Sequence, residues 1–188
     1  MKRKNNFIAL LLALLFLLSA CSDAAEEGSV GESAEESEES TAYVPQNKTL
    51  ISVGKPYQSM YKSHENYADF DGKQLTDGHK VGNEGAHYVD SRMVGFTTST
   101  TFVIDLGDDG KRISALVARS LDYSGDGVAV AASVRFAGSE DGKNFTTLGT
   151  RVFTKSGDLT VSEARFELRK PVDYRFIRVQ INMGSAAF

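Results

Sequence analysis

The chain is poor in the residues that enzyme chemistry most often uses. Its 188 residues include one cysteine, three histidines and no tryptophan. A single cysteine excludes an intramolecular disulfide, and no neighbouring motif supports a catalytic thiol. His64, His79 and His87 lack the spacing of a metal site such as HExxH, so we expect three scattered surface histidines.

Catalytic motifs are also missing from the sequence. No GxSxG, P-loop or GxGxxG motif occurs in a strand–turn–helix context. The acid pairs Asp108-Asp109 and Glu140-Asp141 fall in predicted turns. General acid–base catalysis needs two carboxylates held across a cleft with separated pKa values, which adjacent turn residues do not provide. We therefore predict no enzyme activity of its own, unless a catalytic domain follows Phe188 in a longer protein.

The sequence outside the N-terminal segments has almost no net charge, and therefore no large excess of basic residues. The net charge is −4, from 21 basic and 25 acidic residues. Three of the bases lie at positions 2–4 and eight of the acids at positions 23–39, which leaves 18 bases and 17 acids elsewhere. A nearly neutral remainder has no basic stripe for phosphate contacts, so nucleic acid is not a predicted partner.

The N-terminus has the pattern of a secretory signal. A basic head, MKRKNN, precedes the apolar run Phe7–Ala20, which is shorter than the roughly 20 residues of a membrane-spanning helix. We predict a signal peptide over residues 1–20. The sequence Leu18-Ser19-Ala20-Cys21 resembles the bacterial lipobox. That resemblance implies cleavage before Cys21 and acylation, with palmitate or similar chains, of its thiol and new amino group.

Lipid attachment at Cys21 would place the protein on the extracytoplasmic face of a bacterial cell membrane. Each buried methylene of an acyl chain adds roughly 0.8 kcal/mol, so several chains together anchor stably. The alternative is an ordinary signal peptide with an incidental cysteine.

Residues 21–46 are predicted to form an acidic, disordered tether after the lipidated cysteine. The segment is rich in Glu, Ser, Ala and Gly, as in EEGSVGESAEESEES. Such a composition cannot bury enough apolar surface to offset the entropy of ordering, and its acids repel one another. It is a spacer rather than a site.

A β-strand rhythm begins near Asn47 and continues to the end, which predicts one domain over residues 47–188. Apolar and polar residues alternate in short runs separated by Gly-rich turns about 10 residues apart. This spacing is typical of an antiparallel β-sandwich or barrel. The predicted strands are residues 101–107, 111–121, 127–136, 145–153, 164–168 and 175–182.

The stretch Ser133–Gly149 predicts a β-hairpin. Val134 and Phe136 alternate with polar neighbours, and Asp141-Gly142 supplies a turn in which Gly tolerates a positive φ. We expect Phe145 to pack in the core.

Several short motifs follow one another along the chain between residues 54 and 179. They are Gly54-Lys55-Pro56, Leu75-Thr76-Asp77-Gly78, Asp105-Leu106-Gly107, Ile113, Ser139-Glu140-Asp141-Gly142-Lys143-Asn144-Phe145 and Phe176-Ile177-Arg178-Val179. In this order they resemble the discoidin or coagulation-factor type C domain of the galactose-binding-like superfamily. The resemblance covers roughly residues 50–181 and implies a jelly-roll sandwich that binds carbohydrate.

Two departures from that family stand out. Phe145 occupies a position where the family usually has Trp or another large aromatic residue. The family also returns with a further strand after the segment matched by Phe176–Val179, whereas this sequence stops at Phe188. We therefore expect a sandwich that lacks its closing strand, or a fragment of a longer polypeptide.

The resemblance places ligands on loops at one end of the sandwich, where aromatic faces stack on sugars and polar groups bind hydroxyls. The loops concerned are residues 57–70, 79–96, 121–126 and 154–159. The predicted ligand-binding residues are Tyr88, Arg92, Tyr123, His87 and Asp122. The alternative is that about half of the loop aromatics pack the sandwich.

The family also often holds a structural Ca²⁺ near the Asp-Gly loop. Asp77 is the matching residue, with carbonyls near Lys80 and Asn83 as further oxygen ligands. The alternative role for Asp77 is that of a turn-initiating side chain. No other cofactor is predicted.

The leading hypothesis is a lipid-anchored β-sandwich that binds carbohydrate, either wall glycan or an external polysaccharide. Two alternatives remain open. One is an accessory module of a longer polysaccharide-acting enzyme, and the other is a protein-binding adhesin or sensor module.

Overall fold

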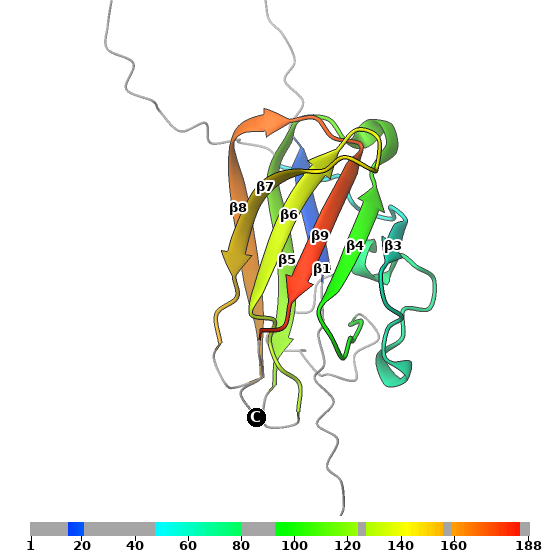
Figure 1. Ribbon diagram of the computed structural model, residues 1–188, viewed down its shortest axis with the longest axis vertical. Helices are drawn as coiled ribbons and strands as arrows, with labels where there is room; N and C mark the ends of the chain where they lie inside the picture. Colours follow the sequence, from blue (N-terminus) through cyan, green and yellow to red (C-terminus); the bar gives the residue numbers. More distant parts are fainter. Residues whose placement is uncertain (1–14, 21–47, 80–92, 124–126, 156–158, 185–188) are drawn as a thin grey trace, which may run out of the picture.

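The protein is an all-β sandwich of two antiparallel sheets (Figure 1). The computed structural model describes the backbone of residues 15–20 and, with side chains, residues 48–79, 93–123, 127–155 and 159–184. In Figure 1 the five-stranded sheet lies in front of the four-stranded sheet. The predicted antiparallel β-sandwich is confirmed.

The five-stranded sheet has the order β3-β4-β9-β6-β7, and every pairing in it is antiparallel. β9, the strand before the C-terminal residues, therefore lies in the middle of the sheet between β4 and β6. The strands are β3 (Tyr57–Ser59), β4 (Thr100–Asp105), β6 (Ser133–Ser139), β7 (Thr146–Val152) and β9 (Phe176–Asn182).

The four-stranded sheet has the order β2-β1-β5-β8. β5 is buried on both faces along almost its whole length, as expected for a central strand. The strands are β1 (Leu15–Ala20), β2 (Thr49–Leu50), β5 (Ile113–Asp122) and β8 (Thr160–Val172).

The segment predicted to end the signal peptide forms β1 in this sheet. β1 pairs antiparallel with β5, from Leu15 opposite Arg119 to Ala20 opposite Ile113, and its last two residues pair with β2. The same apolar run thus supplies a central strand of the uncleaved chain. The prediction of a signal peptide cleaved before Cys21 concerns the processed protein, and it stays a prediction.

The core fills the space between the two sheets. Inward side chains of alternating strand positions, such as Phe102, Leu116, Phe136 and Ile177, are almost completely buried. The rings of Phe96 and Phe102 meet edge-on with centroids 5.2 Å apart, an arrangement that aromatic pairs prefer. Packing of this kind explains how a chain without tryptophan builds a dense core.

The predicted hairpin over residues 133–149 is confirmed as β6, a turn and β7. The expectation for Phe145 is wrong: among the described residues the core includes Leu148 but not Phe145, which is half-buried on the outside of the sheet. The register shifts between Phe136 and Ala137, and such a bulge changes which side chains of β7 face inward.

Strand ends also differ from the sequence prediction. β8 runs over Thr160–Val172, far beyond the predicted 164–168, because its alternation continues through charged residues that face solvent. β6 begins only at Ser133, because residues 127–132 form a turn and an irregular segment.

In the structure, two of the motifs that resemble the discoidin family form turns, and their aspartate side chains hydrogen-bond to the backbone. Gly107 follows β4 with φ of 59°, and its N–H donates to Oδ1 of Asp105 at 2.9 Å. The Asp141 carboxylate accepts from the backbone N–H groups of Lys143 and Asn144, each at 2.8 Å. These hydrogen bonds hold the turns that return the strands to the sheet. No helix among the described residues is long and apolar enough to cross a membrane.

Candidate functional site

The outer face of the five-stranded sheet is polar in its centre. Alternation along β9 buries Ile177, Val179 and Ile181, and turns Arg178 and Gln180 outward. The outward side chains of the neighbouring strands continue this surface. We call it the polar face, and it consists of Thr101, Val103, Ser133, Arg135, Thr147, Thr150, Arg178, Gln180 and Asn182.

The strand register sets which of these side chains are neighbours. Gln180 lies opposite Thr101 of β4 on one side and Arg135 of β6 on the other. Arg135 in turn lies opposite Thr150 of β7. Directly opposed residues have Cβ atoms about 5 Å apart, so four hydrogen-bonding side chains form one row across four strands.

A groove of about 460 Å³ opens at this row. Its lining includes hydroxyl, amide and guanidinium groups but no carboxylate. The lining residues are Ser99, Thr100, Thr101, Ser133, Arg135, Thr150, Gln180, Ile181 and Asn182.

Arg178 lies one row further along β9, opposite Val103 and Ala137. Its guanidinium carbon stands 4.3 Å from the centroid of the Phe145 ring. Its Nε is covered, and it is the one buried side-chain nitrogen or oxygen without a hydrogen-bond partner among the described residues. The arginine is therefore held by stacking on an aromatic face rather than by an acid.

A second groove, of about 390 Å³, opens on the same sheet beyond Arg178. Lys143 and Phe176 contribute to it, as do Gln58 and Val103. Its two acids are already engaged. Asp141 is saturated by the turn hydrogen bonds, which lower the pKa of its carboxyl. Asp105 accepts two hydrogen bonds from Arg175 at 3.0 Å, and these lower its pKa as well.

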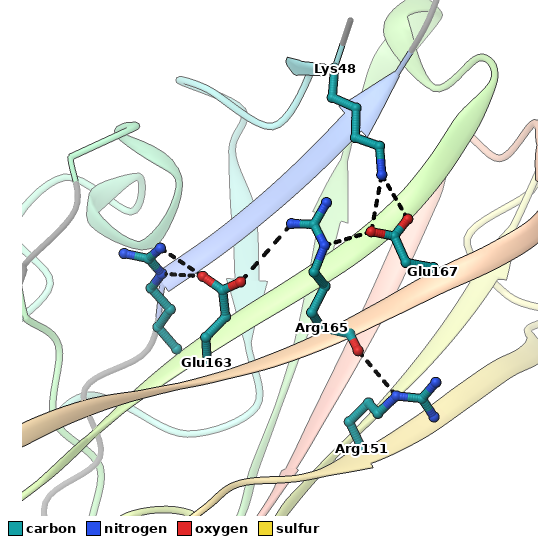
Figure 2. Close-up of polar contacts among 6 residues, drawn as sticks. Lys48, Arg151, Glu163, Arg165 and Glu167 are labelled. Carbon is teal, nitrogen blue, oxygen red and sulfur yellow. Dashed lines mark hydrogen bonds and ion pairs between the residues drawn. The ribbon is translucent and has the colours of Figure 1, made fainter. Parts of the chain in front are cut away.

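The outer face of the four-stranded sheet has a different character (Figure 2). Five of its charged side chains, Lys48, Arg119, Glu163, Arg165 and Glu167, pair with one another. Arg119 binds Glu163 at 2.6 Å, Arg165 binds Glu167 at 2.6 Å, and Lys48 binds Glu167 at 2.8 Å. Arg151 reaches from β7 to the carbonyl of Arg165 at 3.0 Å and lies over the Phe166 ring, which joins the edges of the two sheets. We call these residues the ion-pair ladder.

The structure places only part of the predicted loop site. His87, Tyr88 and Arg92 lie outside the described residues. Asp122 ends β5 and is only 3% exposed, and Tyr123 is half-buried against a small apolar cluster with Leu121. Asp122 is thus buried to the extent that is usual for residues of the protein interior, and Tyr123 is partly so. Their role in ligand binding stays a prediction.

Asp77 is engaged in a local turn. Its Oδ1 accepts from the backbone N–H of His79 at 2.7 Å, and its Oδ2 lies 3.2 Å from the His79 ring. Within the described part of the chain, no three His, Cys, Asp or Glu residues come together as metal ligands do. Lys80 and Asn83, whose carbonyls were the predicted co-ligands, lie outside it, so calcium binding stays a prediction.

The loop at 57–70, also predicted to face ligand, borders a groove of about 400 Å³ with Tyr61, Lys62 and Asp69 in its lining. Tyr57 is not part of this lining: it packs against the core and donates from its hydroxyl to Asp69. Burial and that carboxylate raise the pKa of the Tyr57 hydroxyl, which keeps it neutral. Tyr57 thus braces the loop.

No protein-family model matches the chain, and no curated protein sequence matches it. Among solved structures, it is similar to the crystal structure of the C-terminal domain of a chitobiase from Bacteroides fragilis. The TM-score is 0.37 and the identity 19%, over 69% of this chain and 83% of that one. A likeness of this size supports no argument about ligands.

Sequence reasoning missed the polar face. The signal was present in RFIRVQIN, where Arg178, Gln180 and Asn182 alternate with apolar residues, but alternation also describes an ordinary solvated strand. Only the register shows that Arg135, Gln180 and Thr101, which are far apart in sequence, form one row.

Proposed function

We propose that this protein is a non-catalytic, extracytoplasmic carbohydrate-binding domain of discoidin-like type, and that the polar face is where it binds glycan. The observation that carries the proposal is the groove at Arg135 and Gln180. It presents many hydrogen-bond donors and acceptors on a fixed β-surface. Sugar hydroxyls need that combination, because each both donates and accepts.

Rigidity supports the proposal. The polar face is built on central strands, β9 and its neighbours, whose inward residues are fully packed. The backbone of such strands needs no ordering on binding, so only the side chains lose conformational entropy. Arg178, stacked on Phe145, adds an apolar-edged platform beside the groove.

Lipid anchorage through Cys21 belongs to the same proposal and carries its own test. Cleavage before Cys21 would remove β1 from the sheet, so the anchored protein and the uncleaved structure differ in the strand beside β5. The polar face lies on the other sheet and includes no β1 residue. Intact-mass measurement of the exported protein should show loss of residues 1–20 and a gain of acyl chains. A chain that keeps residue 1 would reject the anchor and leave the glycan proposal standing.

A glycan array with the full chain tests binding itself. We expect retention on at least one polysaccharide, and weaker retention by the Gln180→Ala variant. Arg169→Gln, an exposed substitution on β8, serves as the control. If the folded chain is retained on no glycan, the proposed function is wrong.

Capture of a protein by the polar face would favour the adhesin alternative. That outcome would be recognised by binding that survives enzymatic removal of glycans from the partner.

A further inference from the structure

The charges of the polar face are uncompensated. Arg135 and Arg178 are its two charged residues, and neither forms an ion pair with a carboxylate among the described residues. Arg135 donates to the hydroxyl of Thr147 at 2.7 Å instead. Arg119, Arg165 and Arg175 elsewhere on the molecule each have an acidic partner.

The two arginines are also close to each other. Arg135 lies opposite Gln180, and Arg178 is two residues away from Gln180 on β9. Diagonal neighbours of this kind have Cα atoms about 7–8 Å apart, so one ligand group can lie between both guanidinium groups. Gln180 and Thr101 stand beside that position with neutral hydrogen-bonding groups.

Holding two unpaired guanidinium groups side by side costs free energy, because like charges repel each other. A planar carboxylate relieves that cost. It accepts two parallel N–H bonds from a guanidinium, and such charge-assisted bonds are roughly twice as strong as neutral ones.

We infer that the polar face takes an anionic glycan, one whose sugars carry carboxylates, with Arg135 and Arg178 as the groups that select it. The inference rests on the proposed function and names the substrate class of the same site. The second groove extends the surface with Lys143 and without a free acid. Along β9 the outward positions from Phe176 to Asn182 span roughly 20 Å, enough for several sugar rings.

Matched polymers provide the test. The full chain is titrated with polygalacturonate and with the same polymer after complete methyl esterification. A second pair is hyaluronan and its carboxyl-reduced form. We expect binding of the charged member of at least one pair to be about 10-fold tighter or more, and to weaken as salt is raised.

Substitutions of the two arginines test whether they cause the preference for the charged polymer. Arg135→Gln, together with Arg178→Gln, should bring the two members of the pair to within about 2-fold of each other. Because Arg178 also packs on Phe145, Arg178→Lys is a second variant that keeps the charge. It should retain the salt dependence but lose part of the preference, since Lys cannot bind a carboxylate in bidentate fashion. Arg169→Gln is the control for the single variant Arg135→Gln, because it removes the same one charge from the other sheet.

The results distinguish a failure of this inference from a failure of the proposed carbohydrate binding. Equal affinity for the charged and neutral members would overturn this inference and leave carbohydrate binding intact. A charge preference that Arg169→Gln removes as fully as Arg135→Gln would also overturn it, because it would then reflect overall charge. Binding of none of these polymers would overturn this inference, whereas the proposed function fails only if the folded chain is also retained on no glycan of the array.

Discussion

The two sheets of the sandwich differ in how they are completed and in what they present. The five-stranded sheet is formed by residues 57–182, and its outer face carries arginines without acidic partners. The four-stranded sheet recruits residues 15–20 as β1, and its outer face carries the ion-pair ladder (Figure 2). A face whose charges satisfy one another is built for stability, whereas a face with unpaired hydrogen-bonding groups remains available to a ligand.

Of all the predicted changes, deletion of residues 1–20 should lower the stability of the four-stranded sheet the most. The edge of β5 from Ile113 to Arg119 would lose its partner strand, and β2 would lose its only pairing in the described sheet. With about 1 kcal/mol for each lost hydrogen bond, the free energy of unfolding should fall on the order of 5 kcal/mol. Urea unfolding measures the loss.

A peptide of residues 13–20 added in trans is the matched test of that deletion. It should restore part of the stability by pairing with β5, whereas a peptide of the same composition in scrambled order should not. A deleted chain as stable as the full one would show that β1 contributes nothing to the sandwich.

Gly149→Ala should disturb the junction between the sheets. A Cβ at this position would lie 2.2 Å from the Phe166 ring, so the ring that Arg151 covers must move. Overpacking of this kind typically costs about 1–3 kcal/mol. Thermal unfolding checks it, and the double variant with Phe166→Leu should recover much of the loss. Failure of that rescue would place the strain in the backbone instead.

Glu163→Gln should have a small effect on stability, about 0.5–1 kcal/mol, because the Arg119–Glu163 pair is partly exposed. High salt should reduce the difference between this variant and the parent protein. Glycan binding should not change. A loss of binding would mean that the ladder, and not the polar face, holds the ligand.

The smallest expected effect is a loss of stability at low pH, caused by two carboxylates in or beside the five-stranded sheet. Hydrogen bonds lower the pKa of Asp141, and the Arg175 pair lowers that of Asp105. A folded-state pKa below the unfolded value gives stability that is present above about pH 4 and is lost as the pH falls through the folded value. Urea titrations between pH 6 and pH 2.5 should show this decline, and Asp141→Asn should make it shallower. An unchanged decline would exclude Asp141 as a contributor.

Much of the architecture was predictable because it depends on local patterns. Alternation in TFVIDLG and RFIRVQIN reports which side chains enter the core, and Asp141-Gly142 reports a turn. These signals involve neighbouring residues and elementary backbone geometry.

Other features depend on contacts between residues far apart in the sequence, and sequence patterns therefore did not predict them. Phe145 was expected in the core, but a register shift in the hairpin puts it beneath Arg178 on the outer face. The run Leu15–Ala20 is apolar enough for a signal and also for a buried strand, and composition cannot separate the two. The polar face follows from strand order, which no single segment contains.

One measurement tests the central claim, that the polar face of the five-stranded sheet binds glycan and the ion-pair ladder does not. It is the affinity of the full chain for its best glycan, compared between Gln180→Ala and Glu163→Gln by calorimetry. Gln180→Ala should weaken binding about 5- to 30-fold, as expected for a lost hydrogen bond of about 1–2 kcal/mol, while Glu163→Gln leaves it unchanged. Equal affinity of both variants, or a loss confined to Glu163→Gln, would contradict the assignment of the site.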